Sequence, residues 1–270
     1  MNSHAWSKKN RFAQIQISDF KLSASALKII AHRGASARAP ENTLAAVRLA
    51  AELGAEGVEV DVRVTRDGKL AVLHDTDTRR VAPAQPVYTA KRRRMAELQT
   101  LDVGSWKDAK FTGERVPELG HVLSALGPNQ EILIELKSRE ADIIISELNK
   151  LLEPPKDGGF PSTRVIVMGF DGVTVRKVKK KRPELRVLLL LNKKPSAHVY
   201  GKILSTIAAG HLNGIGQNRT WALAQEQYDE LRAAGAILSA WTVDDAKEAQ
   251  AWRARGFDYL TSNVPDKMKT

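Results

Sequence analysis

The chain of 270 residues contains no cysteine. Disulfide bonds and metal sites built from thiolates are therefore excluded, and the absence fits a reducing compartment. No apolar stretch approaches the roughly 20 residues that a membrane span needs. Residues 1–20 also lack the apolar segment of a secretory signal. These absences predict a cytoplasmic protein.

Acidic residues are outnumbered. The sequence has 42 Lys and Arg against 31 Asp and Glu, a net charge of +11. Such a balance favours anionic partners: a phosphorylated substrate, nucleic acid or an acidic membrane surface. Basic runs at 91–94, 176–182 and 192–194 make nucleic-acid binding a competing function. Because no aromatic residues are interleaved with these runs and no nucleic-acid motif is present, we expect no specific nucleic-acid partner.

Apolar segments alternate with amphipathic ones along most of the chain, and a hydrophobic content of 43% is enough for a sizeable core. Eight segments have the pattern of strands: 27–32, 57–65, 131–137, 163–170, 185–191, 212–216, 236–243 and 257–262. Helical patterns lie between them. This alternation predicts an α/β fold, a closed (β/α)₈ TIM barrel. A doubly wound open sheet is the alternative, but no Gly-x-Gly-x-x-Gly follows the first strand.

Two segments do not fit the alternation. An Asp-Gly turn at 67–68 joins the second strand to a further strand at 69–75, which predicts a β-hairpin, and residues 76–116 follow as an insertion.

The chain ends about eight residues after the last predicted strand, too early for a full eighth helix. Either that helix is missing, or residues 1–27 cover part of the barrel. We expect an N-terminal extension over 1–27 and a barrel domain over 28–270.

Polar and aromatic residues gather where the predicted strands end, which is where the active site of a barrel lies. They are His32, Arg33, Glu59, Asp61, His74, Glu135, Lys137, Phe170 and Trp241. Because side chains alternate along a strand, Glu59 and Asp61 point to one side of the second strand and its valines point to the other. The valines belong under the helices, so the carboxylates are expected in the lumen.

Buried carboxylates without partners are very costly, and a divalent cation would remove that cost. With carboxylate ligands and no cysteine, the hard ions Mg²⁺, Ca²⁺ and Mn²⁺ are favoured over zinc. The alternative is an exposed hairpin whose polar face is in water. Glu135 and Lys137 repeat the polar pattern on the next strand, which argues against that alternative.

Several motifs, in order and correctly spaced, resemble the glycerophosphodiester phosphodiesterases. They are HRGASARAPENT, VEVDVRVTRDGKLAVLHD, LDVGSWKDAKFTGERVPEL and LIELK, with AWTV and LTSNVPD in support. The resemblance covers about 28–266. It implies a metal-dependent (β/α)₈ barrel with a hairpin and an insertion. The implied activity is hydrolysis of a glycerophosphodiester, a small molecule, to sn-glycerol 3-phosphate and an alcohol.

The resemblance also implies a role for each matching residue. The acid–base pair would be His32 and His74, with His74 as the acid. The ligands of one divalent cation, Mg²⁺ or Ca²⁺ with Mn²⁺ as a third choice, would be Glu59, Asp61 and Glu135. The residues that bind the substrate would be Arg33, Lys137, Glu41, Asn42, Phe170 and Trp241. A weak contact with an anionic membrane surface is expected from the charge, and the oligomeric state is not predicted.

Two residues depart from the family's pattern. Thr78 stands where the family has an apolar residue, and Gly169 stands where serine is common. We expect both to alter the pocket for the leaving group. A lysophospholipase D-type activity on lysophospholipids at a membrane surface remains an alternative. The related sphingomyelin-cleaving enzymes are bridged by disulfides, which this chain has no cysteine to form.

Overall fold

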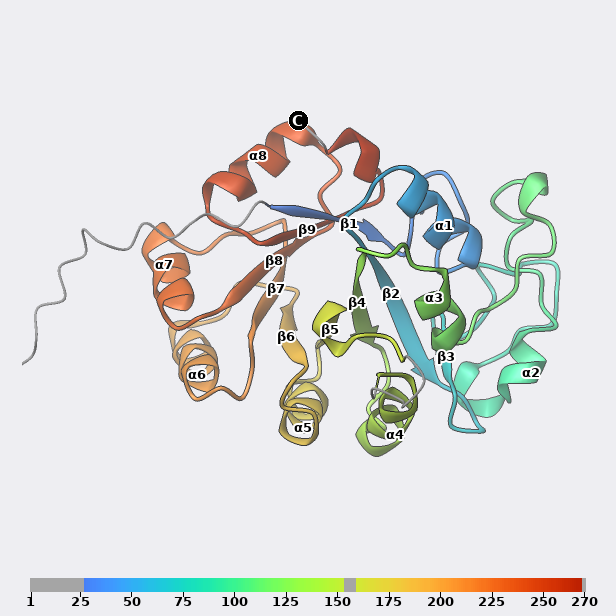
Figure 1. Ribbon diagram of the computed structural model, residues 1–270, viewed down its shortest axis with the longest axis horizontal. Coiled ribbons are helices and arrows are strands. Elements are labelled where there is room, and N and C mark those ends of the chain that lie inside the picture. Colours follow the sequence, from blue (N-terminus) through green and yellow to red (C-terminus); the bar gives the residue numbers. More distant parts are fainter. Residues whose placement is uncertain (1–26, 153–158, 269–270) are drawn as a thin grey trace, which may run out of the picture.

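The computed structural model describes residues 27–152 and 159–268. Eight parallel strands pair side by side and close into a barrel, because the first strand pairs with both the second and the last (Figure 1). The barrel strands are β1 (Lys28–His32), β2 (Gly57–Val64), β4 (Glu131–Leu136), β5 (Val165–Gly169), β6 (Arg186–Leu191), β7 (Gly214–Asn218), β8 (Ile237–Trp241) and β9 (Tyr259–Ser262). The predicted (β/α)₈ barrel is confirmed.

Helices connect successive barrel strands and surround the barrel (Figure 1). They are α1 (Leu44–Glu52), α3 (Leu119–Ala125), α4 (Ala141–Leu152), α5 (Gly172–Lys181), α6 (Ala197–Ala208), α7 (Gln225–Ala233) and α8 (Ala246–Ala254). Side chains that cap helix N-termini fix four of the starts: Thr43, Asp171, Ser196 and Asp245 each accept a hydrogen bond from a backbone N–H three residues on.

The helix that would follow the last barrel strand, β9, is absent from the described part of the chain. After β9 only a short 3₁₀ helix, η5 (Pro265–Lys267), follows. The expected extension over 1–27 lies outside the described residues, apart from Leu27.

The hairpin and the insertion lie where the sequence predicts them. Strand β3 (Leu70–Val72) is antiparallel to β2 and shorter than the predicted 69–75, since the chain bends away after Leu73 donates to the carbonyl of Asp61 at 2.9 Å. The insertion contains η2 (Ala90–Arg92), α2 (Met95–Leu98) and η3 (Ala109–Phe111). It shares a small hydrophobic cluster with Ala71 of β3 and with Leu73, and it lies beside the barrel, at the right of Figure 1.

Alternation along β2 sets the position of the acidic residues. Its valines, Val58, Val60, Val62 and Val64, are buried in the layer between the barrel and the helices. Burying each valine stabilises the fold by about 1.5–3 kcal/mol, and a slip of one residue would turn all four into the lumen. The register that they enforce aligns Glu59 with His32 of β1, and Asp61 with Glu135 of β4.

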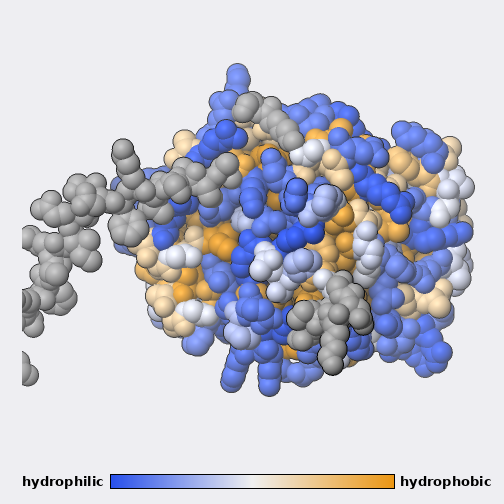
Figure 2. Space-filling model, in the orientation of Figure 1, coloured by the Kyte–Doolittle hydropathy of each residue, from blue (hydrophilic) through white to orange (hydrophobic). Residues whose placement is uncertain are grey.

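The surface in the view of Figure 2 is largely hydrophilic, with hydrophobic residues visible between the polar ones. Within residues 27–152 and 159–268, none of the helices combines the length and the apolar character that crossing a bilayer requires.

Candidate active site

A pocket of about 380 Å³ opens at the C-terminal end of the barrel. Its lining residues are His32, Arg33, Glu59, His74, Glu135, Lys137, Met168, Phe170, Leu190, Asn192, Trp241, Thr242 and Thr261. Most of the residues predicted from the sequence are therefore brought together here. The other three, Glu41, Asn42 and Asp61, contact residues of this pocket or one another but do not line it.

Glu59, Asp61 and Glu135 form a buried carboxylate cluster. One carboxylate oxygen from each lies within 4.8 Å of the others, and Glu59 and Asp61 are both 1% exposed. Two oxygens bound to one hard cation lie at most about 4–5 Å apart, so this spread suits a cation. Oε1 of Glu59 is buried with no hydrogen-bond partner among the described residues. An oxygen in that state is costly, and a bound cation would satisfy it, so the cluster fits a divalent ion.

Nearby cationic side chains compensate the three carboxylates of this cluster to different extents. Lys137 Nζ lies 3.2 Å from Asp61 Oδ1 and 2.5 Å from Glu135 Oε1, and Arg33 Nε lies 3.2 Å from Asp61 Oδ2. Burial raises the pKa of Asp61, but Lys137 and Arg33 outweigh it and hold that pKa below its usual value. Burial and the charge of Asp61 raise the pKa of Glu135 to about 7 and the pKa of Glu59 well above normal. Glu59 is thus the least compensated carboxylate.

Two residues in left-handed backbone conformations hold the cluster in place. Arg33 has φ 55° and Asn42 has φ 58°, which costs on the order of 1–3 kcal/mol for each non-glycine residue. The Arg33 N–H donates to Glu59 Oε2 at 3.0 Å, and the Asn42 N–H donates to the Arg33 carbonyl at 2.9 Å. The Asn42 side chain donates to Asp61 Oδ2 at 2.9 Å and accepts from the Asp61 N–H at 3.2 Å. Asn42 therefore positions Asp61.

His32 has a neutral hydrogen-bond partner. Its Nδ1 lies 2.8 Å from Oδ1 of Asn263, whose Nδ2 donates to Asp244 Oδ2 at 2.7 Å and so fixes the orientation of the amide. Nδ1 must then carry the proton, which leaves Nε2, 3.9 Å from Glu59 Oε2, with a lone pair. Burial and the charge of Arg33 lower the pKa of His32, which favours this neutral form.

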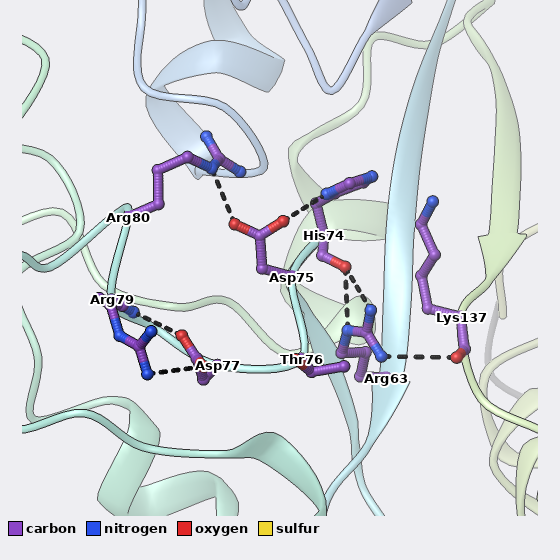
Figure 3. A pocket seen from close by; sticks show the side chains of 8 residues that line it. All are labelled: Arg63, His74, Asp75, Thr76, Asp77, Arg79, Arg80 and Lys137. Carbon is purple, nitrogen blue, oxygen red and sulfur yellow. Dashed lines mark hydrogen bonds and ion pairs between the residues drawn. The ribbon is translucent and has the colours of Figure 1, made fainter.

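His74 has a carboxylate partner. Its Nδ1 donates to Asp75 Oδ1 at 2.7 Å, and Arg80 Nε donates to Asp75 Oδ2 at 2.7 Å (Figure 3). Arg80 also donates to both oxygens of Glu41 at 2.7 Å, and Glu41 accepts from Arg33 at 3.0 Å. A continuous chain of charged hydrogen bonds therefore connects the two histidine-bearing sides of the pocket. Burial lowers the pKa of His74, while Asp61 and Asp75 oppose that shift.

An aromatic pair forms the apolar wall of the pocket. The rings of Phe170 and Trp241 meet edge to face, with centroids 5.6 Å apart. Phe170 is 45% exposed, and Lys137 Nζ lies 6.0 Å from the centroid of its ring. The pocket thus presents a charged side and an apolar side.

Sequence reasoning missed the partners of the two histidines. Asp75 directly follows His74, and Asn263 directly follows the last strand, so adjacency was a usable signal for both. Arg80 gave no signal, because it lies in the insertion and reaches Asp75 and Glu41 only in the folded chain.

The two residues that depart from the family's pattern are not among those that line this pocket, although both chain neighbours of Gly169 are. Thr78 is fully buried in the insertion, where its hydroxyl accepts from the Tyr88 N–H at 3.0 Å. Gly169 ends β5, and a β-carbon there would lie 3.2 Å from Cγ1 of Val175. Neither residue lines the pocket.

Comparisons with known proteins agree on one family. The profile of the glycerophosphoryl diester phosphodiesterase family matches residues 32–267. A glycerophosphodiester phosphodiesterase of Caldanaerobacter subterraneus is 30% identical over 242 residues, covering 89% of this chain and 95% of that protein. One from Bacillus subtilis is 30% identical over 260 residues, covering 91% and 86%.

A solved structure is similar over nearly the whole chain. It is an Oleispira antarctica phosphodiesterase in complex with its product, sn-glycerol 3-phosphate. The TM-score is 0.77 at 27% identity, and the match covers 89% of this chain and 94% of that one.

The uneven charge balance predicts opposite effects for two substitutions that each replace a carboxylate by an amide. In protein treated with chelator, Asp61→Asn should lower the free energy of unfolding by about 3–5 kcal/mol, because it removes the buried carboxylate that Lys137 and Arg33 share. Glu59→Gln should leave that free energy unchanged or raise it, because it removes a poorly compensated charge. Urea denaturation followed by circular dichroism measures both. Equal losses in the two variants would contradict the assigned charge balance.

Proposed function

Because the chain belongs to the glycerophosphoryl diester phosphodiesterase family, whose members are phosphoric diester hydrolases, we propose that it hydrolyses glycerophosphodiesters to sn-glycerol 3-phosphate and an alcohol. The observation that carries this proposal is the pocket itself. Two histidines, a buried carboxylate cluster and two cationic side chains converge in a space of about 380 Å³. The product held by the similar Oleispira antarctica phosphodiesterase supports the choice of product.

Glu59, Asp61 and Glu135 would hold one divalent cation, Mg²⁺, Ca²⁺ or Mn²⁺. When bound, such an ion supplies Lewis-acid polarisation of a phosphoryl oxygen. A phosphodiester anion can bind beside three carboxylates only where positive charge is also present. Arg33 and Lys137 supply that charge. Without positive charge nearby, the cluster would repel the substrate.

Arg33 and Lys137 would bind the phosphodiester. Arg33 uses Nε toward Asp61 and Nη1 toward Glu41, so Nη2 has no hydrogen-bond partner within the described chain and can donate to a phosphoryl oxygen. Lys137 lies between the carboxylates and the aromatic wall. Phe170 and Trp241 would contact the carbon atoms of glycerol or of the head group.

The hydrogen-bond partners of the two histidines support a different role for each. His32, held neutral with its lone pair on Nε2, would accept the proton of the nucleophile as the new P–O bond forms. The nucleophile is water, or the glycerol 2-hydroxyl with water then opening the cyclic phosphate. His74, whose Nδ1–H is held by Asp75, would donate a proton from Nε2 to the leaving alkoxide oxygen as the old P–O bond breaks. The arriving phosphodiester anion favours the protonated form of His74 that this role needs.

Glu41 and Asn42 would act by positioning rather than by contact with substrate. Glu41 links Arg33 to Arg80, and Asn42 holds both the backbone and the side chain of Asp61. Substitution of either residue would change the site through these neighbours.

The proposal also includes a weak contact with an anionic membrane surface, supported by the net charge of +11. The lysophospholipase D-type alternative is not favoured, because the curated relatives are named for glycerophosphodiesters. The cytoplasmic location expected from the sequence stays a prediction.

An assay of glycerophosphocholine, glycerophosphoethanolamine, glycerophosphoglycerol and lysophosphatidylcholine tests the substrate class and the metal together. We expect release of sn-glycerol 3-phosphate from the first three diesters. Chelation should abolish it, and Mg²⁺, Ca²⁺ or Mn²⁺ should restore it. No release from any glycerophosphodiester would refute the substrate class. Full activity after exhaustive chelation, with no metal found by elemental analysis, would refute the metal site.

The general-acid role predicts a dependence on the leaving group. His74→Ala should lower turnover of glycerophosphocholine by about 10²-fold or more, because its alkoxide needs a proton to depart. A nitrophenyl phosphodiester needs little protonation and should lose much less. His121→Ala, at an exposed position on α3, serves as the control. Equal losses on the two substrates would show that His74 is not the acid.

A further inference from the structure

A second pocket, of about 530 Å³, adjoins the first, because His74 and Lys137 line both. Figure 3 shows the eight side chains that line it, from β2, from the segment after β3 and from the end of β4. Four of them are cationic (Arg63, Arg79, Arg80 and Lys137), and two are carboxylates (Asp75 and Asp77). The pocket therefore has an excess of positive charge.

Two of these cations are weakly compensated. Arg63 donates from Nε and Nη2 to the carbonyl of His74, at 2.9 and 2.6 Å, and from Nη1 to the carbonyl of Lys137 at 3.5 Å. No carboxylate of the described chain lies within ion-pair distance of Arg63. The side chain of Arg79 is 75% exposed, and its nearest carboxylate, Asp77, is 3.6 Å away. By contrast, Asp75 and Glu41 offset the charge of Arg80.

The position of this pocket relates it to the leaving group. If His74 protonates the leaving oxygen, as the proposed function has it, the rest of the alcohol must lie on the His74 side of the phosphorus atom. His74 lines both pockets, so an alcohol larger than a few atoms can extend from the first into the second. There it meets Arg63, which has no carboxylate of the described chain within ion-pair distance, and Arg79, whose ion pair with Asp77 spans 3.6 Å.

We propose that this second pocket binds the leaving alcohol and selects alcohols that carry a phosphate group. The inference rests on the proposed function, which supplies the reaction and the place of the leaving oxygen. The favoured substrates are then glycerophosphodiesters with an additional phosphate on the head group, such as a phosphorylated polyol. Arg79 acts as a specificity-determining residue. Arg63 has a second task, because it also holds the backbone of His74 and of Lys137.

The test compares two substrates that differ by one phosphate, glycerophosphoinositol and glycerophosphoinositol 4-phosphate. Wild-type enzyme should show a kcat/KM about ten-fold higher for the phosphorylated substrate, and added salt should shrink the ratio. Arg79→Glu should lower this ratio by about three- to ten-fold. Arg48→Glu, at an exposed position of α1 that lines neither pocket, makes the same charge change and should leave the ratio intact.

A pair of variants separates the two tasks of Arg63. Arg63→Lys keeps the charge but loses the planar donor group that holds two carbonyls, so it should slow both substrates and preserve their ratio. Arg63→Gln should slow both and also lower the ratio. Because the ratio compares substrates on one protein, a general loss of activity cancels from it.

Binding of the product alcohol gives a readout that needs no turnover. Titration calorimetry should show inositol 4-phosphate binding to wild type at least about ten-fold more tightly than inositol, with Arg79→Glu removing most of that difference. Equal binding of both, or a kcat/KM ratio unaffected by Arg79→Glu, would overturn the inference while hydrolysis of glycerophosphoinositol upheld the proposed function. Absence of hydrolysis of every diester would instead overturn the proposed function and, with it, the assignment of this pocket to a leaving group.

Discussion

The negative charge of three carboxylates buried in the barrel lumen is the constraint on which the rest of the site depends. Glu59, Asp61 and Glu135 lie where little water can reach them, so their charge must be offset by neighbours. Lys137 and Arg33 offset part of it, mostly at Asp61. The remainder, concentrated at Glu59, is what makes the cluster suited to a divalent cation.

The same charge explains why the left-handed residues are tolerated. The backbone N–H of Arg33 can reach Glu59, and the amide of Asn42 can reach Asp61, only because the chain turns sharply after β1. Each conformation is unfavourable alone, and hydrogen bonds to buried carboxylates compensate for it. Glu41 and Arg80 continue this hydrogen-bond network: Arg80 donates to Glu41 and to Asp75, and Asp75 accepts from His74.

Much of the fold and the site followed from the sequence, because both depend on alternation along strands. The period of two in β2 separates its valines from Glu59 and Asp61, and the βα series places strand ends at one face. What the sequence did not reveal are contacts between distant segments. Arg80 belongs to an insertion without a periodic pattern, and its bonds to Glu41 and Asp75 depend on how that insertion packs beside the barrel. The compensation of Asp61 by Lys137 likewise depends on the register of β2 with β4.

Anomalous diffraction from crystals of this protein grown with Mn²⁺ tests the central claim most directly, because it locates the ion without relying on activity. The account predicts one strong manganese peak bounded by carboxylate oxygens of Glu59, Asp61 and Glu135. A well-ordered site without any peak there at millimolar Mn²⁺, with Lys137 still bridging Asp61 and Glu135, would show that the lysine alone balances the cluster and would contradict the account.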